Sequence, residues 1–178
     1  PDPQFRTAKL AKEIEKELVP RFPNKEVIPP EVVRTQSRVT LRFNGEAMFP
    51  AGKKQIDPRY HLFLDGIARK AMKHRSNVLV EAHTDNVPFR NSVFRSNTDL
   101  SMARSARVAD YLRTVSGIRD TLILAVGKGP FEPLYRNNTS RRRALNRRIE
   151  ITFIKKMRGA ESKLRGTQGA PVMPIGPR

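Results

Sequence analysis

The segment 78–85 constrains the fold of this chain more than any other part of the sequence. It begins with the apolar run Val78-Leu79-Val80, rich in β-branched residues, which predicts a buried strand over 78–82. The polar turn 83–86 and Pro88 follow directly and end the strand, since Asx residues beside a proline favour a turn. We therefore expect a rigid strand that presents the carboxylate of Asp85 at the edge of the core.

A second polar cluster, residues 96–104, predicts the start of a helix that carries Arg104 in its first turns. This helix is expected from about Thr98 to Val115, where apolar residues share one face, and Gly117 is expected to end it. A carboxylate at a strand end and a guanidinium near a helix start, one loop apart, together form a site for a molecule that bears both charges.

Hydrophobic periodicity predicts the remaining elements. Further helices are expected over 5–18 and from Pro58, with Asp57 as its cap, to about His74, and a short, very basic helix or turn is expected over 140–146. Further strands are expected over 26–33, 38–43, 122–126 and 148–154, with loops over 44–55 and 127–139. Helix 5–18 has a solvated outer face and is interpreted as a packing or connecting helix. Alternating strands and helices predict an α/β (α+β) fold, a two-layer sandwich whose helices cover one face of a mixed sheet.

Composition limits the partners without choosing among them. The net charge of +18 predicts attraction to polyanions, whether nucleic acid, anionic lipid or an acidic cell-wall polymer. The absence of cysteine excludes disulfides and cysteine-based zinc sites, and no metal-ligand spacing links the three histidines, so we expect no metal or cofactor. No apolar run approaches the length of a membrane span, and no signal peptide is visible. The chain begins Pro1-Asp2-Pro3 and is expected to be a fragment without its targeting segment.

Several motifs together carry a family resemblance. In chain order they are His83-Thr84-Asp85, then Asn97-x-x-Leu100-Ser101-x-x-Arg104, then Asn146-Arg147-Arg148-Ile149-Glu150. With them the chain resembles the OmpA-like peptidoglycan-binding domain over roughly residues 30–154. The similarity is greatest to the B subunit of ion-driven flagellar stators, through the sequence His-Thr-Asp-Asn-Val-Pro and the upstream motif Phe43-x-Gly-x-Ala-x-Phe-Pro-x-Gly52.

The resemblance implies a βαβαβ-type fold and binding to the peptide stem of peptidoglycan through diaminopimelate. Carried over to this sequence, Asp85 would hold the ammonium group of diaminopimelate and Arg104 its carboxylate. Thr84, Asn97 and Arg148 complete the predicted ligand-binding residues. Arg148 is expected nearer the site than its neighbour in sequence, because side chains alternate along the last strand.

Other interpretations of these residues stay open at this point. Asp85 also fits a simple turn-former, Arg104 a solvated helix arginine, and Asn97 a helix cap. His83 is expected to order the turn rather than to bind a metal. Ala82 stands where the family usually has glycine, and its methyl group is expected to narrow the approach to the ligand.

The resemblance also predicts a setting for the domain. We expect the periplasmic domain of an inner-membrane protein, a homodimer, and a membrane-embedded motor partner subunit contacted through a missing N-terminal segment. The predicted layout is an N-terminal helix and linker over 1–29, the OmpA-like domain over 30–157, and a basic, disordered tail over 158–178.

A nucleic-acid-binding protein is the alternative, supported by the net charge, the run 141–143 and the basic tail. Against it, aromatic residues make up only 7% of the chain and do not alternate with basic residues for stacking. No helix-turn-helix signature appears. We expect no enzyme: Asp85 with Asp99 or Glu150 forms a possible carboxylate pair, but Asp99 fits a first-turn helix acid and Glu150 a strand exterior.

Overall fold

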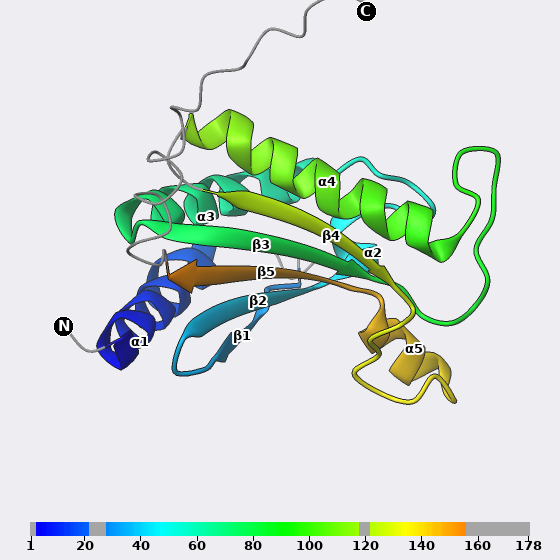
Figure 1. The fold of residues 1–178 in the computed structure, drawn as a ribbon, viewed down its shortest axis with the longest axis horizontal. Helices are drawn as coiled ribbons and strands as arrows, with labels where there is room; N and C mark the ends of the chain where they lie inside the picture. Colours follow the sequence, from blue (N-terminus) through cyan, green and yellow to red (C-terminus); the bar gives the residue numbers. More distant parts are fainter. Residues whose placement is uncertain (1–2, 22–27, 118–121, 156–178) are drawn as a thin grey trace, which may run out of the picture.

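One mixed sheet organises the structure (Figure 1). The computed structural model describes residues 3–21, 28–117 and 122–155. Its strands are β1 (Glu31–Arg34), β2 (Arg38–Asn44), β3 (Ser76–His83), β4 (Ile123–Gly129) and β5 (Arg148–Lys155). They lie in the order β1-β2-β5-β3-β4, antiparallel from β1 to β3 and parallel between β3 and β4.

The helices connect these strands and flank the sheet. They are α1 (Pro3–Glu13), the π-helix η1 (Ile14–Leu18), the 3-10 helices η2 (Val19–Arg21) and η3 (Pro58–Tyr60), α2 (Gly45–Met48), α3 (His61–Lys73), α4 (Asn97–Ser116) and α5 (Ser140–Asn146). Among the residues that the structure describes, no helix has both the length and the apolar composition that a membrane span requires.

Alternation along the strands decides which face of the sheet is buried. In β2, Val39, Leu41 and Phe43 are buried, whereas the residues between them are partly accessible. Leu41 is paired with Ile151 of β5, and Ile151 is paired with Val80 of β3, so apolar side chains of neighbouring strands meet on one face. Burial of these side chains removes apolar area from water and stabilises the sheet.

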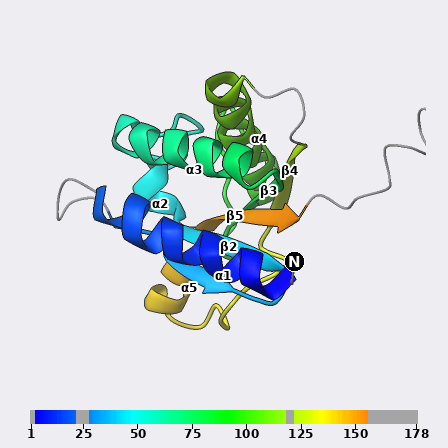
Figure 2. The same cartoon turned by 90° about the vertical axis from the view of Figure 1, so that its left-hand side faces the viewer.

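The helices α1, α3 and α4 lie against this apolar face, as predicted, whereas α5 contributes no residue to the core cluster. Figure 2 shows α3 and α4 side by side, with α1 alongside β2. Side chains of α1 and η1, including Leu10, Ile14 and Leu18, belong to the same core cluster as those of the sheet. The packing role expected for helix 5–18 is confirmed, while the domain boundary drawn at residue 30 stays a prediction.

Most of the predicted elements are confirmed, with differences at their ends. Asp57 caps η3 by accepting a hydrogen bond from the N–H of Arg59, and Gly117 ends α4 with a left-handed φ of 58°. The strand predicted over 26–33 is wrong in its bounds, because β1 begins only after Pro29-Pro30, which have no N–H for the sheet. The loop predicted over 44–55 contains α2. The tail predicted over 158–178 lies outside the described residues.

Candidate ligand-binding site

Asp85 is the second residue after β3, in a turn that the surrounding residues hold in place. The residue is only 6% exposed, and its Oδ1 accepts a hydrogen bond of 2.9 Å from the N–H of Val87. The N–H of Thr84 donates to the carbonyl of Gly129 at 2.9 Å, and its hydroxyl donates to the carbonyl of Asp85. The amide of Asn97 donates to the carbonyls of Asp85 and Val87. The carboxylate is therefore fixed at the end of the sheet, as predicted for a strand-end residue.

Arg147 is the cation that pairs with Asp85. Its Nη1 donates to Asp85 Oδ2, and its Nη2 donates to Glu46 Oε2 at 3.0 Å. Burial lowers the pKa of Arg147, but hydrogen bonds to Asp85 and Glu46 outweigh this effect and raise the pKa above its ordinary value. Gly45 makes this arrangement possible, because a Cβ there would lie 3.0 Å from the backbone of Arg147.

Arg148, predicted to be the nearer of the two arginines, does not contact Asp85. Its guanidinium donates to Glu150 at 2.7 Å and to the carbonyls of Asn146 and Glu132. That prediction is wrong because Arg147 precedes β5 as the C-cap residue of α5, so strand alternation does not govern its direction. Arg148 instead forms an ion pair with Glu150 on the face of the sheet opposite the core, and Glu150 also accepts a hydrogen bond from Arg42.

Arg104 is a buried cation held mainly by neutral groups. It is 6% exposed, its Nε donates to the carbonyl of Lys53 at 3.0 Å, and its Nη2 donates to that of Pro50 at 3.4 Å. The guanidinium carbon lies 5.1 Å from the centre of the Phe49 ring. Within the described part of the chain, no carboxylate forms an ion pair with Arg104. Burial lowers its pKa to about 10, and the negative charge of Glu46 opposes that shift.

Two local features position α4 and therefore Arg104. Ser96 caps the helix by accepting a hydrogen bond from the N–H of Asp99, so the cap role considered for Asn97 belongs to its neighbour. Gly127 of β4 lets the helix approach the sheet, because a Cβ there would lie 2.4 Å from the backbone nitrogen of Met102. The hydroxyl of Ser101 accepts a hydrogen bond from the N–H of Gly129 at 2.9 Å.

Asp85 and Arg104 lie at the same end of the sheet. Asn44, His83 and Arg148 are register partners across β2, β5 and β3, so α2 and the turn after β3 start from one edge. Arg147 links Asp85 to Glu46 of α2, and the charge of Glu46 also acts on Arg104. This edge therefore offers a hydrogen-bond acceptor for an ammonium group and a guanidinium fork for a carboxylate.

His83 is buried beside this edge and stays neutral. It is 4% exposed, and neither ring nitrogen has a hydrogen-bond partner within the described residues. Burial, reinforced by the positive charge of Arg148, lowers its pKa to about 4. No group of histidine and acidic residues able to hold a metal ion is found among the described residues. Ala82 belongs to the hydrophobic core cluster, and the narrowing of the ligand approach expected from its methyl group stays a prediction.

Sequence reasoning missed Arg147 as the partner of Asp85 and Glu46 as the second partner of Arg147. A signal for Glu46 was present, since Asn44 followed by a glycine and an acid is typical of a helix start. Asn44 Oδ1 indeed accepts hydrogen bonds from the N–H groups of Glu46 and Ala47. For Arg147 the only signal in the sequence was the pair Arg147-Arg148. Which of the two arginines contacts Asp85 depended on where α5 ends.

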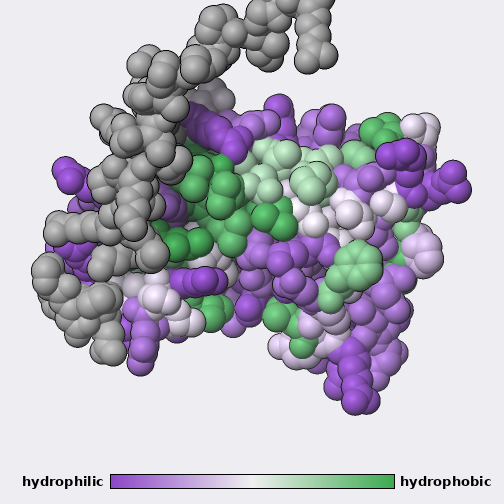
Figure 3. Space-filling model, viewed as in Figure 1, coloured by the Kyte–Doolittle hydropathy of each residue, from purple (hydrophilic) through white to green (hydrophobic). Residues whose placement is uncertain are grey.

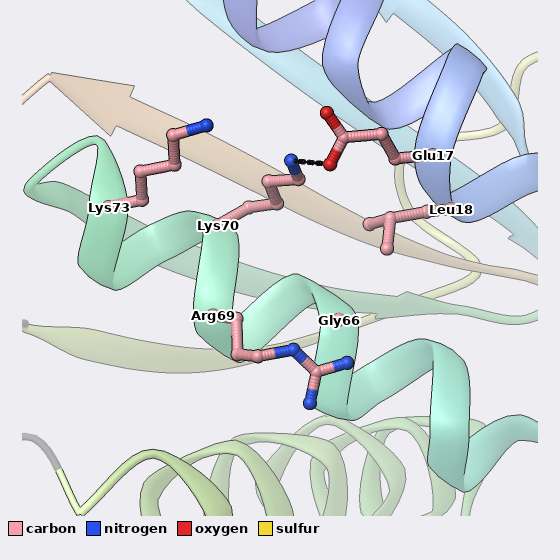
Figure 4. Close-up of a pocket in the computed structure, with 6 residues that line it drawn as sticks. All are labelled: Glu17, Leu18, Gly66, Arg69, Lys70 and Lys73. Carbon is pink, nitrogen blue, oxygen red and sulfur yellow. Dashed lines mark hydrogen bonds and ion pairs between the residues drawn. The ribbon is translucent and has the colours of Figure 1, made fainter.

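A cavity of about 230 Å³ lies elsewhere, between η1 and α3 (Figure 4). It is lined by Glu17, Leu18, Gly66, Arg69, Lys70 and Lys73. Lys70 is already engaged there with Glu13 and Glu17, so the cavity belongs to the contact that attaches the N-terminal helix.

Comparison with known proteins gives one family and related folds. The model of the OmpA family matches residues 48–147. Motility protein B of Bacillus subtilis is 33% identical over 78 residues, which is 44% of this chain and 30% of that protein. The chain thus matches about a third of that relative's length.

Solved structures agree with this match. The cell wall anchor of the T6SS from Pseudomonas aeruginosa has a TM-score of 0.69 and 28% sequence identity, over 86% of this chain and 99% of the other. A MotB-like protein from Desulfovibrio vulgaris has a TM-score of 0.73 at 24% identity, over 86% and 94% of the two chains. The mixed sheet with helices is the fold of these structures, as the sequence predicts.

Proposed function

Because the chain belongs to the OmpA family, we propose that it binds peptidoglycan non-covalently and anchors a larger, stator-like membrane protein to the cell wall. The ligand is the stem peptide, recognised through the free end of diaminopimelate. That end carries an ammonium and a carboxylate on one carbon, the two charges for which Asp85 and Arg104 are suited.

The observation that carries this proposal is the burial of Arg104 without a carboxylate partner among the described residues. A cation that is 6% exposed and has no carboxylate partner among the described residues is costly to bury. The carbonyls of Lys53 and Pro50 use Nε and Nη2, which leaves Nη1 without a hydrogen bond to the described chain. An incoming carboxylate would supply the missing negative charge, with a strong charge-assisted bond.

Asp85 would receive the ammonium group by sharing its carboxylate with Arg147. Arg147 keeps its hydrogen bond to Glu46 when Asp85 turns to the ligand, so no cation is left unpaired. The bond from Val87 N–H to Asp85 Oδ1 fixes the carboxylate during this exchange. Hydrogen bonds to charged groups contribute about 1.5–3 kcal/mol each. After ordering costs, a short stem peptide should bind with a Kd on the order of micromolar to millimolar, and the many stems of a wall would prolong attachment.

Sedimentation with purified sacculi tests the proposed site. Asp85→Ala and Arg104→Ala should each abolish co-sedimentation while the circular dichroism spectrum stays that of the wild type. Matched controls are Asp110→Ala and Arg107→Ala, which remove the same charges from exposed positions of α4 and should leave binding unchanged. Full retention of binding by both site variants would remove this site from the proposal.

The stem amino acid is tested separately. Sacculi whose stems carry lysine in place of diaminopimelate keep the side-chain ammonium but lack the second carboxylate. We expect the wild type to sediment with diaminopimelate walls and only weakly with lysine walls. Equal sedimentation with both would show that the wall is bound without recognition of diaminopimelate.

The setting of the whole protein is part of the same proposal. We propose a periplasmic domain of an inner-membrane protein that dimerises and works with a membrane-embedded motor subunit, and likeness to Motility protein B supports a place in a motility system. Likeness to the T6SS anchor supports a second candidate, a wall anchor for a secretion system. Deletion of the gene distinguishes them: loss of swimming with normal secretion favours the motor, and the reverse favours the secretion system.

A further inference from the structure

The lobe of residues 130–146, called the α5 lobe below, projects from the sheet next to the candidate site (Figure 1). Its sequence combines one acid, Glu132, with four arginines: Arg136, Arg141, Arg142 and Arg143. Glu132 is already paired with Lys128 at 2.7 Å. The lobe therefore presents a positive surface with little internal compensation.

Large apolar side chains are exposed on the same lobe. Phe131 is 77% exposed, Tyr135 48%, Leu145 46% and Leu134 39%. Figure 3 shows this part of the surface as mainly hydrophilic, with hydrophobic residues beside it. Neither the candidate site nor the core uses these side chains.

The lobe is built rigidly enough to hold this surface. Asn146 is fully buried, and its Oδ1 accepts from the N–H groups of Leu134 and Tyr135 at 2.9 and 3.0 Å. Its Nδ2 donates to the carbonyl of Tyr135 and to Asn137 Oδ1, both at 2.8 Å. Asn146 therefore fixes the backbone of Leu134 and Tyr135 to the end of α5, the helix that carries Leu145.

We propose that the α5 lobe docks on the surface of an anionic phospholipid bilayer. Arginines beside exposed aromatic and aliphatic side chains are the composition of interfacial membrane-binding segments. A linear polyanion such as nucleic acid would use the arginines and stack on the aromatic rings, but it offers nothing to the two leucines. A bilayer surface can bind both kinds of side chain, because lipid phosphates pair with the arginines and the boundary of the acyl chains buries the apolar side chains.

Two arginines allow a clean test. Within the described residues, Arg136 and Arg141 form no hydrogen bond or ion pair with their side chains, so the double variant R136Q/R141Q leaves the lobe's own contacts intact. The matched control R34Q/R38Q removes the same charge from the turn between β1 and β2, at the opposite end of the sheet. Both variants are made in the full chain, so any contribution of the remaining basic residues is common to them.

The measurement is co-sedimentation with vesicles of phosphatidylglycerol and phosphatidylcholine, against vesicles of phosphatidylcholine alone. The wild type should bind only the anionic vesicles. R136Q/R141Q should weaken the partition constant roughly fivefold for each arginine removed. Y135S/L145S should weaken it as well, with the melting temperature unchanged, and the control should bind nearly as the wild type does.

Other outcomes overturn the proposal. An equal loss in R34Q/R38Q and R136Q/R141Q would show that net charge alone attracts the protein to the vesicles. Unchanged vesicle binding in R136Q/R141Q, with reduced binding to polyphosphate, would assign the lobe to a linear polyanion. Sacculus binding keeps the two proposals apart, because R136Q/R141Q should still sediment with sacculi and Asp85→Ala should still bind vesicles.

Discussion

At the scale of single residues, the geometry around Arg104 depends on its planar fork. Nε and Nη2 reach two different carbonyls, and the ring of Phe49 lies against the guanidinium. Arg104→Lys keeps a positive charge but cannot span both carbonyls and a ligand carboxylate. We expect this variant to bind sacculi at least about tenfold more weakly, which is the loss of one charge-assisted hydrogen bond.

A sedimentation titration of Arg104→Lys against Arg107→Lys measures this effect. Arg107 is exposed on the same helix, so its replacement controls for the change of residue type. Near-normal binding of Arg104→Lys would show that a point charge suffices there and that the fork plays no role.

His83 predicts a pH dependence of folding. Burial lowers its pKa to about 4, below the ordinary value of 6.5, so the unfolded chain binds the proton more readily than the folded protein does. The free energy of unfolding is therefore unaffected by this histidine above pH 6.5. It decreases as the pH falls from 6.5 towards 4, by about 3 kcal/mol in total. Urea unfolding at a series of pH values measures it.

Variants without the titrating ring isolate the contribution of His83. His83→Gln and His83→Leu differ in polarity, so their absolute stabilities should differ. Both should nevertheless lose the decline in stability between pH 6.5 and 4. Persistence of the wild-type decline in both variants would assign it to another group.

Sequence reasoning succeeded for residues whose place follows from local pattern. Asp85 is the second residue after the apolar strand β3, so its place at the sheet edge is set by β3 itself. The choice between Arg147 and Arg148 depended on the exact residue where α5 ends and β5 begins, and helix ends are the least certain part of any pattern. The roles of Asp85, Arg104, Thr84 and Asn97 in ligand binding stay predictions.

At the scale of elements, a cluster of ion pairs attaches the N-terminal helix to α3, and Figure 4 shows one of them, between Glu17 and Lys70. Glu13 accepts from Lys70 at 3.0 Å, from Lys73 at 3.1 Å and contacts His74 Nε2 at 3.0 Å. Glu17 also pairs with Lys70. Glu13→Gln should destabilise the protein by about 1 kcal/mol, since Lys70 keeps Glu17 as a partner. Urea unfolding at pH 7 checks this value.

Glu15→Gln is the matched control, because Glu15 is exposed two residues further along the chain and forms no ion pair within the described residues. The hydrogen bond with His74, followed by those with Lys70 and Lys73, lowers the pKa of Glu13 to about 2. This stabilisation is present above pH 4.5 and is lost as the pH falls through 4.5 towards 2. If Glu13→Gln matched Glu15→Gln in stability at pH 7, the ion pairs would contribute nothing to attachment of the helix.

Elements with a strong period were predicted well, and the short basic segment 140–146 is indeed helical, but the shortest α-helix, α2, was missed. Alternation in β2 and the apolar face of α4 indicate their structures without any tertiary information. The helix α2 has four residues and exists because Asn44 caps it and Gly45 packs on the backbone of Arg147. That packing is a contact between residues far apart in sequence, so no local pattern could indicate it.

At the scale of the whole molecule, the alternation of strands and helices was enough to predict the layers but not their order. β5, the last strand, lies in the middle of the sheet between β2 and β3. The apolar side chains on the inner face of β5 need apolar neighbours on both flanks, and β2 and β3 supply them. On the opposite face of the sheet, Glu150 of β5 forms ion pairs with Arg42 and Arg148. Such pairing of charges across strands is visible only once the register is known.

The net charge of +18 gives the last prediction, which separates general attraction from recognition of one ligand. Binding through many phosphate contacts weakens steeply as salt rises, because each contact releases counterions. Recognition of a zwitterion in a buried site releases few, and buried pairs are screened much less than exposed ones. Sacculus binding of the wild type should therefore show a shallow slope against the logarithm of salt concentration. The residual binding of Asp85→Ala, if detectable, should show a steep one, because only the exposed charge remains to hold the wall. A steep slope for the wild type, equal to that of Asp85→Ala, would mean that the surface charge binds the wall and that the pair Asp85 and Arg104 does not.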